Sequence, residues 1–260
     1  MPSYKLTIAY DGTQYSGWQI QPNGISIQQC VQNALKVILH QEVPIIGSGR
    51  TDAGVHAVAQ VAHFRHTEAL DLYRLLFSLN GLLPRDIRVK KVEVVADSFH
   101  ARYSAIGKEY HYHLHLEKVM DPFRRLYCWH VPFRIDQTLL KEAALFFIGT
   151  HDFTSFANES HAGSASRDPI RTLSLLVSEE VEGGVLLKFK ANGFLYKMVR
   201  NIVGTLIEIA SGKRFIQDIP QLFAGRNRRL TGQAAPPQGL FLMQVDYPAI
   251  FTDSQGENNL

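Results

Sequence analysis

The sequence has little cysteine and no long apolar run, and each absence excludes a class of protein. Its two cysteines, Cys30 and Cys128, lie far apart, and neither belongs to a Cys-x-x-Cys unit. A disulfide framework is therefore excluded, and we interpret both side chains as free thiols of a reducing cytosol. The longest apolar runs, such as Leu75-Leu76-Phe77, are a few residues long, whereas a membrane span needs about 18. We expect no membrane association.

A signal peptide and a strong excess of one charge are also missing. The chain begins Met1-Pro2-Ser3-Tyr4-Lys5 and continues directly into an alternating pattern, which predicts a cytoplasmic protein. The 27 Lys and Arg residues against 24 Asp and Glu give a net charge of +3. This mild excess does not distinguish an ordinary enzyme from a protein that binds polyanions. The length of 260 residues suffices for one large or two small globular domains.

The first hundred residues predict the order strand, helix, strand, strand, helix, strand of a ferredoxin-like unit. Apolar and polar residues alternate from Tyr4 and indicate a strand. Helical spacing begins after Ser26, which together with Gln29 has the form of a capping box, and continues to about Gln41. The remaining predictions are strands at residues 43–48, 58–64 and 87–95 and a helix from Leu72 that stops near Gly81.

A similar order recurs after residue 105. Strands are predicted at residues 108–116, 127–133, 171–181, 185–191 and 240–247, and helices at residues 137–149 and 194–211. We therefore predict an α+β fold of two ferredoxin-like halves, with antiparallel sheets joined into one central sheet. The predicted domains are residues 1–105 and 106–247, followed by a loose tail at residues 248–260.

The densest local signal is the loop Gly47-Ser48-Gly49-Arg50-Thr51-Asp52-Ala53-Gly54-Val55-His56-Ala57. Glycines permit backbone geometries that a side chain forbids, so Asp52 is predicted on a tight loop between two strands. Its carboxylate is either presented for chemistry or caps backbone amides of a hairpin turn, with Arg50 as a surface charge. Composition alone leaves both interpretations open.

Six segments in register resemble the motifs of the tRNA pseudouridine synthase A (TruA) family. Residues 49–57 of the loop are similar to its catalytic motif. The other five segments, in family order, are YDGTQYSGWQ at residues 10–19, FHARYSA at 99–105, GTHDFTSF at 149–156, MVRNIVG at 198–204 and GLFL at 239–242. The resemblance covers residues 4–247 and implies the pseudouridine synthase fold.

The resemblance implies a cofactor-independent isomerase that converts uridine to pseudouridine at positions 38 to 40 in the anticodon stem-loop of tRNA. Asp52 would be the nucleophile, Tyr110 would lie against the target uracil, and Arg200 would pair with the aspartate. By the same resemblance, Arg50 helps to hold the flipped nucleotide and Leu242 packs under the uracil. A homodimer is implied as well, because family members assemble so that one tRNA contacts both subunits.

The chemistry of the reaction agrees with these roles. Isomerisation breaks the bond between N1 and C1′, turns the base and rejoins it through C5 without net redox change, so no cofactor is required. A carboxylate attacks only when it is ionised, and a nearby guanidinium such as Arg200 favours that form. A base removed from its stack recovers energy on an aromatic ring, although Tyr110 also fits a plain core position. The sequence leaves open whether Asp52 attacks C1′ or C6.

Histidines give a rival interpretation. A predicted strand carries His111, His113 and His115 in alternation, and the next carries Cys128 and His130. Such a cluster could hold zinc and make the chain a metal-dependent hydrolase. No Cys pair or His-Glu-x-x-His unit completes a site, so we expect no metal and instead a stripe of solvated or RNA-facing histidines.

Basic residues form short groups that become candidate phosphate contacts if the substrate is tRNA. They are Arg124 and Arg125, Lys188 and Lys190, Lys213 and Arg214, and Arg226, Arg228 and Arg229. Each group by itself also fits a solvated face. A second hypothesis is a non-catalytic RNA-binding module on the same fold, but its signature, a changed residue at position 52, is absent.

Overall fold

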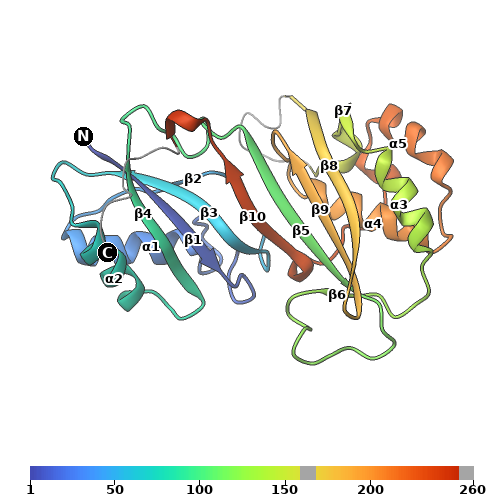
Figure 1. The fold of residues 1–260 in the computed structure, drawn as a ribbon, viewed down its shortest axis with the longest axis horizontal. Helices are drawn as coiled ribbons and strands as arrows, with labels where there is room; N and C mark the ends of the chain where they lie inside the picture. The colour runs from blue at the N-terminus through green and yellow to red at the C-terminus, as the bar shows by residue number, and fades with distance from the viewer. Residues whose placement is uncertain (159–167, 252–260) are drawn as a thin grey trace. The chain divides into compact units, whose positions relative to one another are not determined.

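The computed structural model describes residues 1–158 and 168–251, and the chain divides into two compact units (Figure 1). The first unit contains residues up to Ile106 and those from Leu242 onward, and the second contains Gly107–Phe241. The predicted boundary after residue 105 is one residue from this division. Residues 242–247, which we assigned to the second half, instead return to the first unit.

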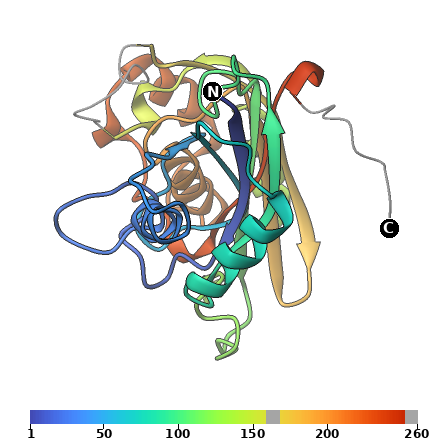
Figure 2. The same cartoon turned by 90° about the vertical axis from the view of Figure 1, so that its left-hand side faces the viewer.

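The first unit has the predicted ferredoxin-like order. Its elements are β1 (Ser3–Tyr10), α1 (Ile27–Leu39), β2 (Ile46–Gly47), β3 (His56–Arg65), α2 (Leu72–Leu82) and β4 (Ile87–Val95). β1 pairs antiparallel with β3 on one side and β4 on the other, and β2 pairs antiparallel with β3. The helix α1 lies beside this sheet (Figure 2) and packs against α2.

Local sequence explains these elements. The alternating Tyr4, Leu6, Ile8 and Tyr10 of β1 are all buried, as a strand with one face on a core requires. At the start of α1, the Ser26 hydroxyl accepts the N–H of Gln29 at 3.2 Å, which is the N-cap half of the predicted capping box.

The second unit repeats the pattern. Its elements are β5 (Gly107–His115), β6 (Trp129–His130), α3 (Gln137–Leu145), β7 (Gly149–Asp152), β8 (Ile170–Val181), β9 (Gly184–Ala191), α4 (Met198–Ala210), α5 (Ile219–Gly225) and the start of β10 (Leu240–Asp246). The antiparallel order is β5-β9-β8-β7, and β6 adds a short parallel pair to β5. The predicted α+β class with antiparallel sheets is confirmed.

The strands predicted at residues 43–48 and 127–133 are much shorter than expected. The observed strands are β2 (Ile46–Gly47) and β6 (Trp129–His130). Before β2, the N–H of Ile45 donates to Gln32 and its carbonyl accepts from Gln28. Side chains of α1 therefore use the backbone N–H and C=O of Ile45 that pairing with a neighbouring strand would require. The second strand is followed by Pro132, which has no N–H to donate to a ladder.

The helix predicted from Phe194 begins four residues later, at Met198. Lys197 precedes it with a φ of 59°, a left-handed conformation that breaks helical geometry. The short α5 and β7 were not predicted from the sequence. No helix within residues 1–158 and 168–251 is long and apolar enough to cross a membrane.

The first residues of the predicted tail contact the first unit. Ala249–Phe251 form a short 3-10 turn, and the rings of Phe251 and Phe99 lie 5.4 Å apart. The rest of the predicted tail, residues 252–260, lies outside the described residues.

Candidate active site

Asp52 lies on the loop between β2 and β3, as predicted. Its side chain is half-buried, whereas Arg50 is exposed. The N–H of Val55 donates to the carbonyl of Asp52 at 3.1 Å and closes a four-residue turn. Gly54, the third residue of that turn, has a φ of 76°, which glycine adopts without the steric cost of a Cβ. The turn therefore fixes the backbone immediately after Asp52.

Thr51, the neighbour of Asp52, is held by two residues of the segment 10–19. The hydroxyls of Thr51 and Tyr10 lie 2.8 Å apart in a buried hydrogen bond, and the N–H of Trp18 donates to the carbonyl of Thr51 at 3.1 Å. Burial raises the pKa of Tyr10 far above its usual value, so this hydroxyl stays protonated. The Asp52 loop is thereby tied to the core of the first unit.

Two glycines of the same segment allow its close approach to the loop. A Cβ on Gly12 would lie 2.0 Å from the carbonyl oxygen of Val55, and one on Gly17 would lie 2.3 Å from that of Thr51. The N–H of Gly12 also donates to Nδ1 of His56 at 3.1 Å, and His56 is 1% exposed. The segment 10–19 and the Asp52 loop therefore pack as one body within the first unit.

Tyr110 lies on β5 with only 8% of its surface exposed. Its ring meets that of Phe194 edge-on, with 5.0 Å between centroids. In the sheet it stands opposite Phe189 of β9. Two residues further along β5, the hydroxyl of Tyr112 donates to the carbonyl of Pro236 at 2.7 Å. Tyr110 therefore packs against another aromatic side chain, that of Phe194. Phe194 was not singled out from the sequence as a site residue.

Arg200 lies in the first turn of α4 and is half-buried. Its Nε donates to the carbonyl of Ala235 at 2.7 Å, and the N–H of Ala235 donates to the carbonyl of Arg200 at 2.9 Å. Its positive charge opposes the rise in the pKa of Tyr112 that burial causes. The guanidinium is therefore oriented by a backbone carbonyl and acts electrostatically on the Tyr112 side chain of β5.

Both units contribute predicted site residues. Asp52, Arg50 and Leu242 belong to the first unit, and Tyr110 and Arg200 belong to the second. Leu242 lies on β10 and is 1% exposed. The roles of all five, and the pairing of Asp52 with Arg200, stay predictions.

Of the three histidines of β5, His115 does not fit the predicted stripe of solvated or RNA-facing histidines, whereas His111 and His113 are half-buried. His115 is 1% exposed, and its Nε2 lies 3.1 Å from the carbonyl oxygen of Val119, in the segment that follows β5. His111 contacts Glu109 at 2.8 Å, and the ring of His113 lies 5.1 Å from that of Phe241. Within the described part of the chain, no group of three or more His, Cys, Asp or Glu side chains could hold a metal ion.

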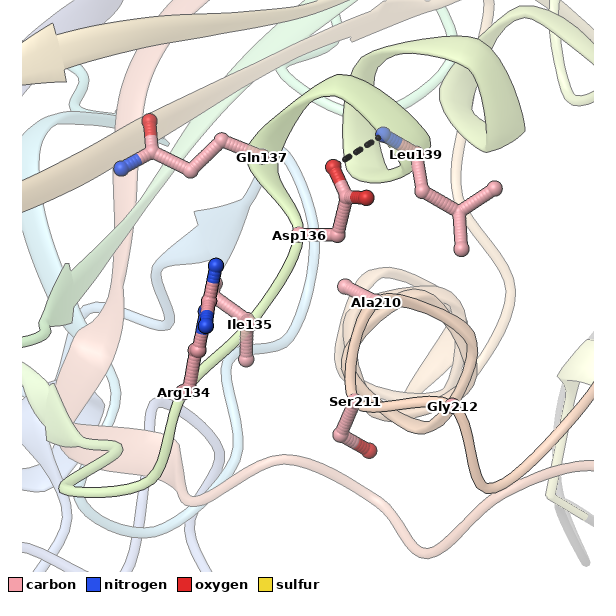
Figure 3. Close-up of a pocket in the computed structure, with 8 residues that line it drawn as sticks. All are labelled: Arg134, Ile135, Asp136, Gln137, Leu139, Ala210, Ser211 and Gly212. Carbon is pink, nitrogen blue, oxygen red and sulfur yellow. Dashed lines mark hydrogen bonds between the residues drawn. The ribbon is translucent and has the colours of Figure 1, made fainter.

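A hollow of about 620 Å³ lies between the start of α3 and the end of α4 (Figure 3). Asp136 caps α3 there by accepting the N–H of Leu139 at 3.0 Å, and its own N–H donates to the carbonyl of Ala210 at 2.7 Å. The hollow is lined by Arg134, Ile135, Asp136, Gln137, Leu139, Ala210, Ser211 and Gly212. This set includes none of the predicted site residues.

Several of the basic residues considered as phosphate contacts are paired within the protein. Ion pairs join Lys188 to Glu179 at 2.6 Å, Arg214 to Glu208 at 3.1 Å and Arg226 to Asp152 at 2.9 Å. Arg228 is half-buried and donates to side chains of its own unit. The structure therefore gives Arg228 an internal role that the sequence did not reveal.

Comparison with known proteins identifies the family. The model of the family described as tRNA pseudouridine synthase matches residues 6–104 and 143–248. The chain belongs to the tRNA pseudouridine synthase family. It is 64% identical over 248 residues to tRNA pseudouridine synthase A 1 of Protochlamydia amoebophila, covering 95% of this chain and 97% of that protein. It is 44% identical over 245 residues to tRNA pseudouridine synthase A of Bacillus pumilus, covering 94% and 98%. The predicted family and its enzyme class, an isomerase, are confirmed.

The sequence of this pseudouridine synthase reveals the motifs but not all of the contacts that hold their residues in place. The motif at residues 10–19 contains Tyr10, Gly12, Gly17 and Trp18, so the sequence carried a signal for these residues. The contact of Ala235 with Arg200 and the internal role of Arg228 had no such signal, because they join residues far apart in the chain.

Proposed function

We propose that this chain isomerises uridine to pseudouridine in tRNA, at positions 38 to 40 of the anticodon stem-loop, with Asp52 as the nucleophile. The observation that carries the proposal is the Asp52 loop. Asp52 follows Thr51, which is hydrogen-bonded to Tyr10 and Trp18. Asp52 is also the first residue of the turn in which Gly54 has a positive φ. Such a loop holds a nucleophile in place before the substrate arrives, which lowers the entropic part of the barrier.

The reaction balances without a co-reactant. The bond between N1 and C1′ breaks, the base turns, and a bond forms between C5 and C1′, while C5 loses a proton and N1 gains one. No electrons enter or leave, so no cofactor is part of the proposal. Attack at C1′ or at C6 both require an ionised Asp52, and pairing with the guanidinium of Arg200 would favour that form.

The remaining site residues serve the flipped nucleotide. Extruding a base costs a few kcal/mol, and stacking on an aromatic ring returns about 1–3 kcal/mol. Tyr110, set rigidly against Phe194, is the proposed surface for the uracil, and Leu242 packs beneath it. The exposed Arg50 is placed two residues before the nucleophile and holds the nucleotide phosphate by charge.

The proposal includes a homodimer located in the cytoplasm. The family resemblance supports a dimer in which one tRNA contacts both subunits. The free thiols of Cys30 and Cys128 support the location, because free cysteines are typical of a reducing compartment.

The decisive test uses unmodified tRNA transcripts with uridine at positions 38, 39 or 40, and maps pseudouridine by its chemical reactivity. We expect Asp52→Asn to abolish turnover while tRNA binding survives largely intact, because many phosphate contacts carry binding. Asp97→Asn, the same change at an exposed carboxylate, is the matched control and should keep the wild-type rate.

Other results would favour the rival functions. Tight tRNA binding by the wild-type protein without any pseudouridine would indicate the non-catalytic RNA-binding module. Wild-type turnover by Asp52→Asn would exclude Asp52 as the nucleophile and leave it as a cap of the loop. Pseudouridine at other tRNA positions would keep the chemistry and overturn the anticodon assignment.

A further inference from the structure

A buried polar network surrounds the residue that follows Arg200. Asn201 is fully buried. Its Oδ1 accepts from Nη2 of Arg228 at 2.8 Å, and its Nδ2 donates to the carbonyl of Phe156 at 2.9 Å and to Oδ1 of Asn158 at 3.0 Å. A buried amide with its polar atoms bonded in this way has a single preferred orientation.

Arg228 spreads its donors over three neighbours. Besides Asn201, it donates from Nη1 to Oγ1 of Thr231 at 2.8 Å and from Nε to Oδ1 of Asn158 at 3.3 Å. The Thr231 hydroxyl in turn lies 2.9 Å from the carbonyl oxygen of Ser155. A guanidinium committed to three side chains in a half-buried position is poorly placed to bind a phosphate, which needs the same donors.

The network is connected to Arg200 in two ways, through Asn201 and through Thr231. Asn201 lies in the same helical turn as Arg200. Thr231 begins the segment 231–235, which runs along α4: Gly232 donates its N–H to Oγ1 of Thr205 at 3.2 Å, and Ala235 exchanges hydrogen bonds with Arg200. Gly204 permits this approach, because a Cβ there would lie 1.8 Å from a backbone oxygen of the segment.

We propose that Arg228 is a positioning residue for the reaction. It fixes α4 against the segment 231–235, so that the carbonyl of Ala235 holds the guanidinium of Arg200 in its working orientation. The proposal rests on the proposed function, in which Arg200 pairs with the nucleophile. It also separates Arg228 from the exposed Arg229 beside it, although both belong to one basic cluster in the sequence.

The test compares Arg228→Met, which keeps the aliphatic stem and removes the donors, with Arg228→Lys, which restores one charged donor. Arg74→Met, at an arginine that is 85% exposed on α2, is the matched control. Three quantities are measured: the single-turnover rate at saturating tRNA, the tRNA affinity as a function of salt, and the unfolding transition in urea. The rates are taken at a temperature where every variant is fully folded.

We expect Arg228→Met to lower the saturated rate at least tenfold and to leave affinity and its salt dependence within twofold of wild type. Arg228→Lys should recover part of the rate, and Arg74→Met should match wild type. A lower stability with an unchanged rate for the folded protein would show a merely structural role and overturn the proposal. A weaker affinity with a flatter salt dependence and an unchanged saturated rate would show a phosphate contact and overturn it as well.

The variant Arg200→Met distinguishes this inference from the proposed function. If Arg228 acts through Arg200, the double variant should be no slower than Arg200→Met alone, because one interaction cannot be lost twice. Additive losses would overturn the positioning role while leaving the proposed function intact. A wild-type rate for Arg200→Met would instead contradict the proposed role of Arg200, and the inference with it.

Discussion

His63 of β3 is buried beside His100, with 4.8 Å between the ring centroids. Its Nδ1 accepts the N–H of Ala101 at 3.2 Å, so the folded state holds the ring in its neutral form. Burial, together with the nearby His100 and Arg65, lowers the pKa of His63 to about 4 from 6.5. Because the unfolded chain binds this proton first, His63 stabilises the fold fully above about pH 6.5, and that contribution is lost as the pH falls toward 4.

We expect the free energy of unfolding to fall by about 1 kcal/mol through His63 alone between pH 7.5 and pH 5.5. His63→Asn, whose Oδ1 can replace Nδ1 as the acceptor, should remove that part of the pH dependence in urea titrations. His40→Asn is the control, since His40 is exposed and sits in a left-handed conformation that asparagine tolerates. Equal pH dependence in His63→Asn and wild type would contradict the assignment.

At the scale of elements, glycines have opposite roles in the Asp52 loop and in α2. Gly17 has a φ of 91° and faces the carbonyl oxygen of Thr51, whereas Gly81 lies within α2 with no atom within 4 Å of an added Cβ. The first glycine is required by geometry. The second only weakens its helix through the entropy of the unfolded chain.

Gly17→Ala should therefore destabilise the protein by at least about 1–2 kcal/mol, the cost of a left-handed alanine, before the clash with Thr51 is added. It should also lower the turnover rate, because the Asp52 loop must move away. Gly81→Ala should stabilise the protein by about 0.5–1 kcal/mol with turnover unchanged. Urea unfolding and single-turnover rates check both, and a Gly17→Ala protein with wild-type stability and rate would contradict the packing argument.

At the scale of the molecule, the chain builds one unit, passes into a second after Ile106 and returns to the first at Leu242. The proposed site residues are divided between these units. The proposed function adds a second copy of the chain, because one tRNA would contact both subunits of a dimer.

Light scattering should therefore give a mass near twice 29.3 kDa at the concentrations used for turnover. When the Asp52→Asn variant is mixed with wild-type protein, the mixed dimer should bind tRNA with unchanged affinity, because binding does not depend on the nucleophile. A fully active protein with the mass of one chain would contradict the dimer.

The sequence by itself determined the features that depend on neighbouring residues. Alternation predicted β1, and the glycines around Asp52 predicted a tight loop, because each depends on residues within a few positions. The motif residues also led to the family and to the candidate nucleophile.

Only the tertiary structure decided which groups meet across long stretches of chain. Gln28 and Gln32 of α1 shorten β2 by bonding Ile45, and Arg228 is drawn into the network of Asn201 and Thr231. No local pattern distinguishes Arg228 from the exposed Arg229, because both are arginines of one loop. The difference arises from partial burial, which removes part of the water around the Arg228 guanidinium and favours protein partners for its donors.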